Sequence, residues 1–487
     1  MKIFNKASKK NGVFSGLMWS FGERITAQLV SLLVTIVLAR LLEPEHYAPI
    51  AVVSIFITIA NAFVTGGFGN ALIQKKDADE LDFSTTLAFS FLLSVVFYLI
   101  LFFCAPLVSE YYKEPILAPV LRVMSLRICV ASINSIQHAY VSKQKAFRKF
   151  FFSTLGGTIV SAIVGIIMAY TGFGVWALAA QYLINTMIDT VVLFFTSGWK
   201  VKIGFSFERM KRLFSYGWKL LVTEVIASVS AEAQGIVLSA GFQPVQLSYY
   251  NQGSKYPKLF INNIEASMHK VLLQELADNQ DDISKVKAIT RSTIELTTFI
   301  MCPLLFGMAA CGAIIIKILL TEKWLSCVAY LQIACFTDIL HPIFSAHTRA
   351  MKAMGESKSV LINAIIKYTI SIIYLLFSIF FIKEPHFVIL ATTIEFLVAC
   401  ICGGYVSKKN FGYSFKEQLQ DVYKTLLNGL AMFLAVLSIE TISLPPWLLL
   451  VLQVLLGIVV YISLSFIFNK KVFQQCLVYF KKKFCRT

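Results

Sequence analysis

Charged side chains stand inside apolar stretches of this chain that are long enough to cross a membrane. Glu23 and Arg24 come first, within the apolar stretch 14–42. An ionised group at that depth costs several kcal/mol unless it faces protein or water. Such residues are therefore functional candidates by default.

Charges of both signs occur in these stretches, and they suggest two kinds of chemistry. Clustered Arg and Lys in a water-filled cavity suit an anionic cargo, because both side chains bind phosphates through charge-assisted hydrogen bonds. Acids beside them can balance the cations or carry coupling protons. The candidate cavity cations are Arg24, Arg122, Arg127, Lys255, Lys258 and Lys367. The candidate charge-balancing or ion-coupling acids are Glu23, Glu224, Glu232, Glu265, Asp189 and Asp338.

Two stretches carry their polar residues at helical spacing. In 14–42 these residues are Ser20, Arg24, Gln28, Ser31 and Thr35. In 247–270 they are Asn251, Lys255, Lys258, Asn262, Glu265 and His269. Steps of three and four residues place side chains on one helical face, so each stretch predicts a helix with one polar, water-exposed face.

Structural pairing between helices is the alternative to a functional role for each of these charges. Asp189, Lys367 and Glu395 stand alone in their stretches, so either explanation remains open for them. A cavity role is the preferred interpretation for Arg24, Arg122, Lys255 and Lys258.

The composition indicates a membrane protein with many helical spans. Of the 487 residues, 57% are hydrophobic and only 15% are charged, whereas soluble domains carry about 25% charged residues. The apolar runs are continuous rather than alternating, which excludes a β-barrel. The ten cysteines show no zinc or disulfide spacing, so no metal is predicted.

The net charge of +17 would suggest nucleic acid in a soluble protein, but here topology explains it. The segments on one side of the membrane, with their flanking residues, carry 32 of the 44 Lys and Arg residues, and those on the other side carry 3. Cytoplasmic loops carry such an excess, so both termini are predicted to be cytoplasmic.

Stretch 247–270 is polar, but it is counted as crossing because the later basic loops would otherwise face outward. The fourteen predicted spans are 14–42, 46–68, 83–106, 116–138, 152–171, 174–197, 216–240, 247–270, 292–318, 326–346, 358–382, 386–406, 424–442 and 446–468.

A weak internal repeat with an offset of about 200 residues divides the spans. Trp19 matches Trp218, and Pro44 matches Pro244. The repeat predicts two pseudo-symmetric six-helix lobes around a central cavity, followed by two further helices. The predicted parts are a tail (1–13), an N-lobe (14–200), an inter-lobe linker (201–215), a C-lobe (216–406), a pair of spans with its preceding loop (407–468) and a basic tail (469–487).

Motifs typical of enzymes are missing from the sequence. There is no G-x-x-x-x-G-K-[ST], no H-E-x-x-H and no G-x-S-x-G, and the loops leave no room for a nucleotide-hydrolysing domain. The chain is therefore predicted not to be an enzyme, and no catalytic residue is assigned.

Several motifs resemble those of a transporter family. They are G-x-x-W-S-x-x-E-R at 16–24 followed by L-A-R-L-L-E-P-E-H-Y-A at 38–48, K-A-F-R-K after span 4, G-F-G-V-W-A-L at 172–178 and F-S-Y-G-W-K at 214–219. Together they are similar to polysaccharide transporters of the multidrug/oligosaccharidyl-lipid/polysaccharide (MOP) superfamily, the Wzx-type flippases. The resemblance covers essentially the whole chain.

The resemblance implies a flippase that moves undecaprenyl-diphosphate-linked oligosaccharide across the bacterial cytoplasmic membrane by alternating access. The first hypothesis is that a proton or sodium gradient powers this movement, and no cofactor and no nucleic acid are predicted. The implied partners are the lipid-linked substrate, membrane lipids, a polysaccharide polymerase and its chain-length machinery. A drug or metabolite antiporter of the same fold is the first alternative. A membrane-bound glycan polymerase or ligase is the second, although the short external loops speak against it.

Overall fold

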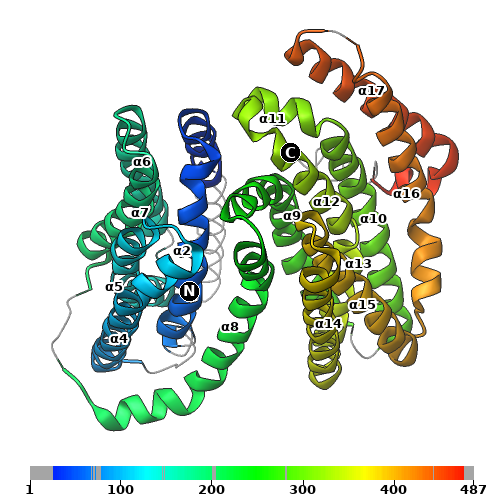
Figure 1. Cartoon of the computed structure of the whole chain (residues 1–487). Helices are drawn as coiled ribbons and strands as arrows, with labels where there is room; N and C mark the ends of the chain where they lie inside the picture. The colour runs from blue at the N-terminus through cyan, green and yellow to red at the C-terminus, as the bar shows by residue number, and fades with distance from the viewer. Residues whose placement is uncertain are drawn as a thin grey trace, which may run out of the picture. The chain divides into compact units, whose positions relative to one another are not determined.

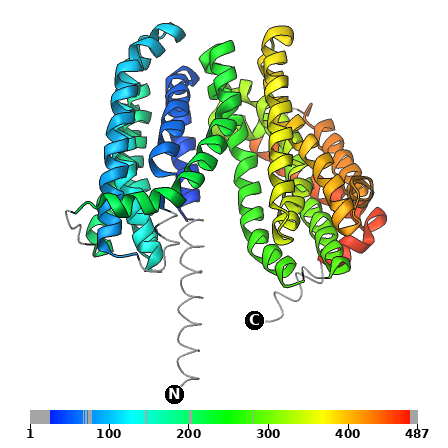
Figure 2. The same ribbon diagram turned by 90° about the horizontal axis from the view of Figure 1, so that it is seen from below.

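The described part of the protein is built from helices. The computed structural model describes residues 26–66, 68, 69, 72, 78–144, 146, 148–199, 204–279, 282–442 and 444–476, and no strand occurs among them. They fall into two packing units that divide between Ser248 and Tyr249. Both units are drawn in Figure 1 and, from below, in Figure 2.

The first unit is a bundle with one long, curved helix beside it (Figure 1). Residues from α2, α5 and α7 supply most of its core, because these helices pack on one another. The curved helix, α8, packs against α2 and α4. Its helices are Thr26–Leu41, α2 (Pro44–Thr65), α4 (Glu80–Tyr112), α5 (Leu117–Lys143), α6 (Arg148–Tyr170), α7 (Val175–Ser197) and α8 (Phe207–Gly241).

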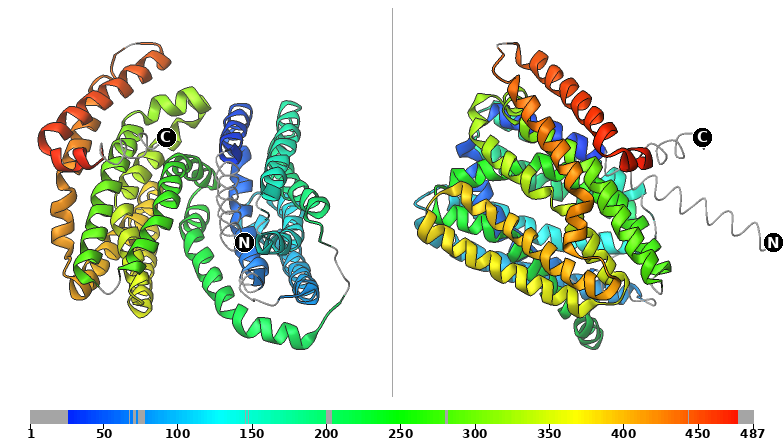
Figure 3. Two further views of the ribbon diagram at one scale, coloured as in Figure 1. Left: turned by 180° about the vertical axis from the view of Figure 1, so that it is seen from behind. Right: turned by 90° about the vertical axis from the view of Figure 1, so that its right-hand side faces the viewer.

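In the second unit, α10 packs against most of the other helices. The last long pair, α16 and α17, lies at one side of this unit (Figure 3, orange to red). Its elements are α9 (Pro244–Asp278, which begins in the first unit), α10 (Ile283–Ala310), α11 (Gly312–Leu320), η1 (Glu322–Cys327), α12 (Val328–Asp338), α13 (His341–Ala353), α14 (Ser357–Phe377), η2 (Ser378–Ile382), α15 (Pro385–Phe411), α16 (Phe415–Ser438) and α17 (Pro446–Phe468).

The prediction of a helical protein with many membrane spans is confirmed. Within the described residues, ten helices are long and apolar enough to cross a membrane, or eleven if the bent pair 322–338 and 341–353 forms one span. That pair bends by 42° just before Pro342, whose nitrogen carries no hydrogen and cannot donate to the preceding turn of a helix. The predicted total of fourteen spans stays a prediction, because this count of ten or eleven covers only the described residues and only helices of sufficient length and apolar character.

Two predicted spans belong to polar helices. The long helices α8 and α9 contain the predicted spans 216–240 and 247–270, and neither is among the ten. Helix α8 starts at Phe207, within the predicted linker 201–215, and it packs in the first unit. The division into two lobes stays a prediction, since packing units and sequence repeats need not share a boundary.

Polar contacts tie α8 to the start of α4. The carboxylate of Asp79 caps α4 by accepting from the backbone N–H of Asp82 at 2.9 Å. Arg209 of α8 pairs with Asp79, and its Nη1 lies 3.4 Å from Oδ1 of Asp82. The hydrogen bond from Arg209 lowers the pKa of Asp79 to about 2. The pair therefore keeps its charges at any physiological pH.

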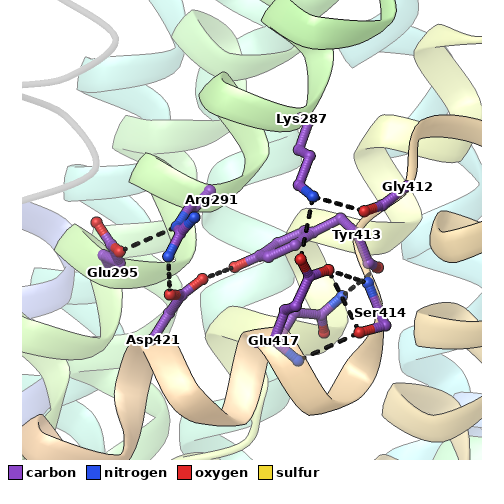
Figure 4. A network of polar contacts seen from close by, with 9 residues as sticks. Lys287, Arg291, Glu295, Gly412, Tyr413, Ser414, Glu417 and Asp421 are labelled. Carbon is purple, nitrogen blue, oxygen red and sulfur yellow. Dashed lines mark hydrogen bonds and ion pairs between the residues drawn. The ribbon is translucent and has the colours of Figure 1, made fainter.

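A second polar network ties α10 to α16 (Figure 4). Arg291 of α10 pairs with Asp421 of α16, which also accepts a hydrogen bond of 2.7 Å from the Tyr413 hydroxyl. One turn earlier on α10, Lys287 lies 3.2 Å from Glu417. Charges that the sequence assigned to loops thus join two helices.

One glycine sets the packing of α9. A Cβ added to Gly253 would lie 2.6 Å from the carbonyl oxygen of Cys327 and 2.8 Å from the backbone nitrogen of Leu331. These are backbone atoms that cannot rotate away. The absence of a side chain therefore allows α9 to approach α12 closely.

We expect Gly253→Ala to lower the stability of the protein. Overpacking of this kind costs about 1–3 kcal/mol, which outweighs the better helix propensity of alanine, about 1 kcal/mol. The midpoint of thermal unfolding in detergent measures the change. Gly307→Ala is the matched control, because its Cβ would meet only a flexible methionine tip at 3.7 Å. A loss of stability in the control as large as in Gly253→Ala would contradict the packing argument.

Candidate functional site

A buried ion pair joins α14 and α15 in the second unit. Nζ of Lys367 lies 2.8 Å from Oε1 of Glu395, and the two side chains are only 8% and 17% exposed. The ammonium also lies 4.8 Å from the ring centre of Phe344 and 4.3 Å from that of Tyr368. Aromatic faces attract cations, so the rings and the carboxylate together hold the charge of Lys367.

A second group of charges joins α9 to α13. Oε1 of Glu265 lies 3.1 Å from Nδ1 of His341 and 3.1 Å from Nη2 of Arg349. Arg349 is 9% exposed and His341 is 17% exposed. One carboxylate therefore holds two basic side chains that stand two helical turns apart on α13.

Aromatic rings connect the two groups. The rings of Phe344 and Phe396 stack with their centres 5.4 Å apart. The ring of His341 packs edge-on against both. Its centre lies 6.1 Å from that of Phe344 and 5.5 Å from that of Phe396. Phe344 in turn lies under Lys367. We call the five charged or titratable residues the ion cluster: Glu265, His341, Arg349, Lys367 and Glu395.

Asp338 extends the cluster toward α9. It ends α12 and is 9% exposed, and it interacts electrostatically with His341 and Lys258. Lys258 is exposed, and its Nζ lies 5.7 Å from the ring centre of Tyr250. Of the predicted site residues, the structure thus brings Glu265, Asp338, Lys258 and Lys367 into one region of the second unit.

The cluster is arranged for charge balance. It holds two carboxylates, Lys367 and Arg349, so its formal charge is zero with neutral His341 and +1 with protonated His341. Protonation of Glu265 would remove the charge that holds His341 and Arg349. Such an arrangement can couple the arrival of a proton or cation to the position of α13 relative to α9.

In the first unit, Asp189 of α7 is also paired. It accepts a hydrogen bond of 2.9 Å from Nδ2 of Asn134, and Nε2 of His138 lies 3.3 Å from the same oxygen. Both partners come from α5, one helical turn apart. A residue that stands alone in its own stretch is therefore part of a polar group between two helices.

The first-unit arginines contact groups on neighbouring helices. Nε of Arg127 donates to the Thr186 hydroxyl at 2.9 Å. Nε of Arg122 donates to the carbonyl oxygen of Phe102 at 3.3 Å, and its guanidinium lies 4.5 Å from the Phe102 ring centre. In the described part of the chain, neither guanidinium forms an ion pair with a carboxylate.

The remaining predicted residues lie on α8 and α9 or outside the described residues. Lys255 is half-buried on α9, Glu224 is exposed on α8, and Glu232 is half-buried on α8. Glu23 and Arg24 lie outside the described residues, as does Ser20.

Arg349 and the pairing of Lys367 with Glu395 were not predicted. Arg349 was counted in a basic cytoplasmic loop, although it stands eight residues after His341, at helical spacing on one face. Lys367 precedes the turn at Lys383 and Glu395 follows it. The two residues therefore lie at similar depths in the membrane, on neighbouring spans. Comparing depths in neighbouring spans is the signal that could have found the pair.

Comparisons with known proteins place the chain among polysaccharide biosynthesis proteins. A family model described as "Polysaccharide biosynthesis protein" matches residues 37–329. The teichuronic acid biosynthesis protein TuaB of Bacillus subtilis is 21% identical over 411 residues, which cover 82% of this chain and 83% of the relative. The lipopolysaccharide biosynthesis protein WzxC of Escherichia coli is 22% identical over 346 residues, 69% of each chain.

Solved structures show the same fold. The lipid II flippase MurJ in an inward closed conformation matches with a TM-score of 0.77 and 19% identity, covering 94% of this chain and 100% of that one. An inward-facing multidrug resistance transporter of the MATE family, within the MOP superfamily, matches with a TM-score of 0.64 and 15% identity. It covers 80% of this chain and 96% of that one. At these identities the likeness extends to the fold alone.

Proposed function

Because the chain belongs to the polysaccharide biosynthesis protein family, we propose that it is a flippase for lipid-linked oligosaccharides. It moves undecaprenyl-diphosphate-linked repeat units across the bacterial cytoplasmic membrane for the assembly of a surface polysaccharide. The observation that carries this proposal is the family match over 37–329 in a chain with ten helices long and apolar enough to cross a membrane among its described residues. The names of TuaB and WzxC, both biosynthesis proteins of surface polymers, support it.

In the proposed layout, fourteen helices cross the membrane with both termini in the cytoplasm. The distribution of Lys and Arg supports this orientation, with 32 of these residues in the segments on the cytoplasmic side and 3 in those on the other side. The polar helices α8 and α9 then cross as walls of a water-filled cavity between two lobes, because water and cargo can solvate their charged faces.

The charged residues take two roles in this proposal. Arg24, Arg122, Lys255 and Lys258 bind the diphosphate of the cargo, since clustered cations suit phosphate oxygens. The ion cluster of the second unit couples a proton or sodium gradient to the change between inward-facing and outward-facing states. The paired state of Lys367 supports coupling rather than direct contact with cargo.

A complementation experiment tests the role of the cavity cations. In a strain that lacks this protein, the wild type is expected to restore the surface polysaccharide. We expect Lys255→Ala to reach the membrane at normal levels but to leave lipid-linked units unexported, with output reduced by about tenfold or more, because losing a charge-assisted hydrogen bond costs about 1.5–3 kcal/mol.

Lys317→Ala is the matched control. Lys317 is half-exposed and pairs with Glu322 at a helix end, so its loss should leave export unchanged. Normal polysaccharide in the Lys255→Ala strain would remove Lys255 from the cargo site.

A further inference from the structure

A pocket of about 830 Å³ opens in the first unit, apart from the charged residues discussed above. Its volume is typical of ligand sites. It lies among α4, α5, α7 and the residues on either side of 200–203. The lining is almost wholly apolar and comprises Ser84, Leu87, Ala88, Phe91, Ile133, Gln137, Thr190, Val191, Phe194, Phe195, Trp199, Gly204 and Phe205.

Two polar groups in this lining have no hydrogen-bond partner within the described residues. Both amide atoms of Gln137, which is 0% exposed, are unpartnered, and so is Nε1 of Trp199, which is 5% exposed. The lining hydroxyls differ, because Ser84 and Thr190 donate to carbonyl oxygens of their own helices. Leaving a buried amide unpaired costs free energy. The amide N–H groups of Gln137 and the indole N–H of Trp199 can therefore donate to a ligand that offers hydrogen-bond acceptors.

The pocket lies near one end of the helices and at the bilayer side of the bundle. Trp199 stands two residues after the end of α7, and its ring contacts those of Phe83, at the start of α4, and Tyr140, near the end of α5. Several lining residues on membrane-crossing helices are exposed, among them Phe91, Phe194 and Phe195. In a membrane this apolar exposure faces lipid, and tryptophan is enriched at the level of the headgroups.

The chemistry of the pocket selects one kind of lipid. Its lining offers neutral donors, an amide and an indole N–H, and the described lining residues include no charged side chain. A diphosphate or phosphate would call for Arg or Lys at this position. An ester carbonyl is a neutral acceptor that lies just below the headgroups, beside an acyl chain that fits the apolar lining.

We propose that this pocket binds an acyl chain of a membrane glycerophospholipid, with its ester carbonyl accepting hydrogen bonds from Gln137 and Trp199. By the distribution of Lys and Arg the pocket stands in the cytoplasmic leaflet, next to the basic segment 198–215. The site is separate from the proposed cargo path, and its test does not depend on flippase activity.

Native mass spectrometry of the purified full-length protein tests this site with three probes, of which the first two are a matched pair. These are dipalmitoyl phosphatidylglycerol and its ether-linked analogue, which has the same chains and headgroup but no ester carbonyl. The wild type is expected to bind the ester lipid about tenfold more tightly, because the ether leaves Gln137 unpaired. In Gln137→Leu the preference should fall to the small part that the Trp199 N–H still supplies, while the ether lipid binds as before.

Two further variants keep the result interpretable. Gln181→Leu makes the same chemical change on α7 outside the pocket, and it should keep the tenfold preference. Ala88→Trp places a bulky side chain at an exposed lining position, and it should remove one bound lipid of either kind.

The proposal fails if the wild type binds ester and ether lipids equally, or if Gln137→Leu keeps the preference. Undecaprenyl phosphate is the third probe, and its binding should be the same in Gln137→Leu and wild type. A dependence of its affinity, instead of that of the ester lipid, on Gln137 would identify an isoprenoid as the occupant and overturn the proposal.

Discussion

Lys367→Met is expected to destabilise the protein and to stop export. Removing one partner of a buried ion pair costs about 3–5 kcal/mol, because the other charge is left uncompensated. Glu395, which is 17% exposed, would be that charge. The midpoint of thermal unfolding in detergent measures the first effect, and complementation of surface polysaccharide measures the second.

A double variant separates the two effects. Lys367→Met with Glu395→Leu removes both charges, and replacing a buried pair by apolar residues is often neutral or stabilising. We therefore expect the double variant to regain most of the lost stability. If the pair takes part in coupling, export stays low although the protein is stable. Full export in the double variant would leave the pair with a structural role only.

Glu265→Gln is expected to have the second largest effect, on the energy coupling of export. Oε1 of Glu265 lies 3.1 Å from Nδ1 of His341 and 3.1 Å from Nη2 of Arg349. The glutamine keeps the shape of the side chain but carries no charge, so it resembles the protonated state permanently. Export should fall and should no longer respond to an imposed pH or sodium gradient.

Glu275→Gln is the control for this change. It lies on the same helix, α9, at an exposed position, and it should leave export and its gradient dependence unchanged. Export that still follows the gradient in Glu265→Gln would exclude Glu265 as the coupling group.

The class of the fold could be predicted from the sequence because the length of an apolar run is a local property. The bend before Pro342 also has a local cause, since proline acts on its own helix. The close approach of α9 at Gly253 could not be predicted, because it depends on backbone atoms of Cys327 and Leu331, more than seventy residues away.

The candidate site was predicted in part. Helical spacing identified polar faces in the stretches 14–42 and 247–270. It could not tell which helix each face meets, so Asp189 and Lys367 were treated as single charges although both are paired. Partners on other helices are set by tertiary packing, and Arg349 was overlooked because its helix continues past the predicted span end at 346.

The movement of lipid-linked oligosaccharide across a bilayer is the central claim, and reconstitution tests it most directly. The purified protein is placed in liposomes with radiolabelled lipid-linked repeat units extracted from the strain that lacks it, and a pH and sodium gradient is imposed across the vesicle membrane. Periodate, which does not enter the vesicles, then oxidises the sugars exposed on the outside. With the wild type, nearly all the label is expected to become accessible over time, whereas Lys255→Ala should leave the inner share protected. Equal protection in vesicles with the wild type and in protein-free vesicles would contradict a flippase.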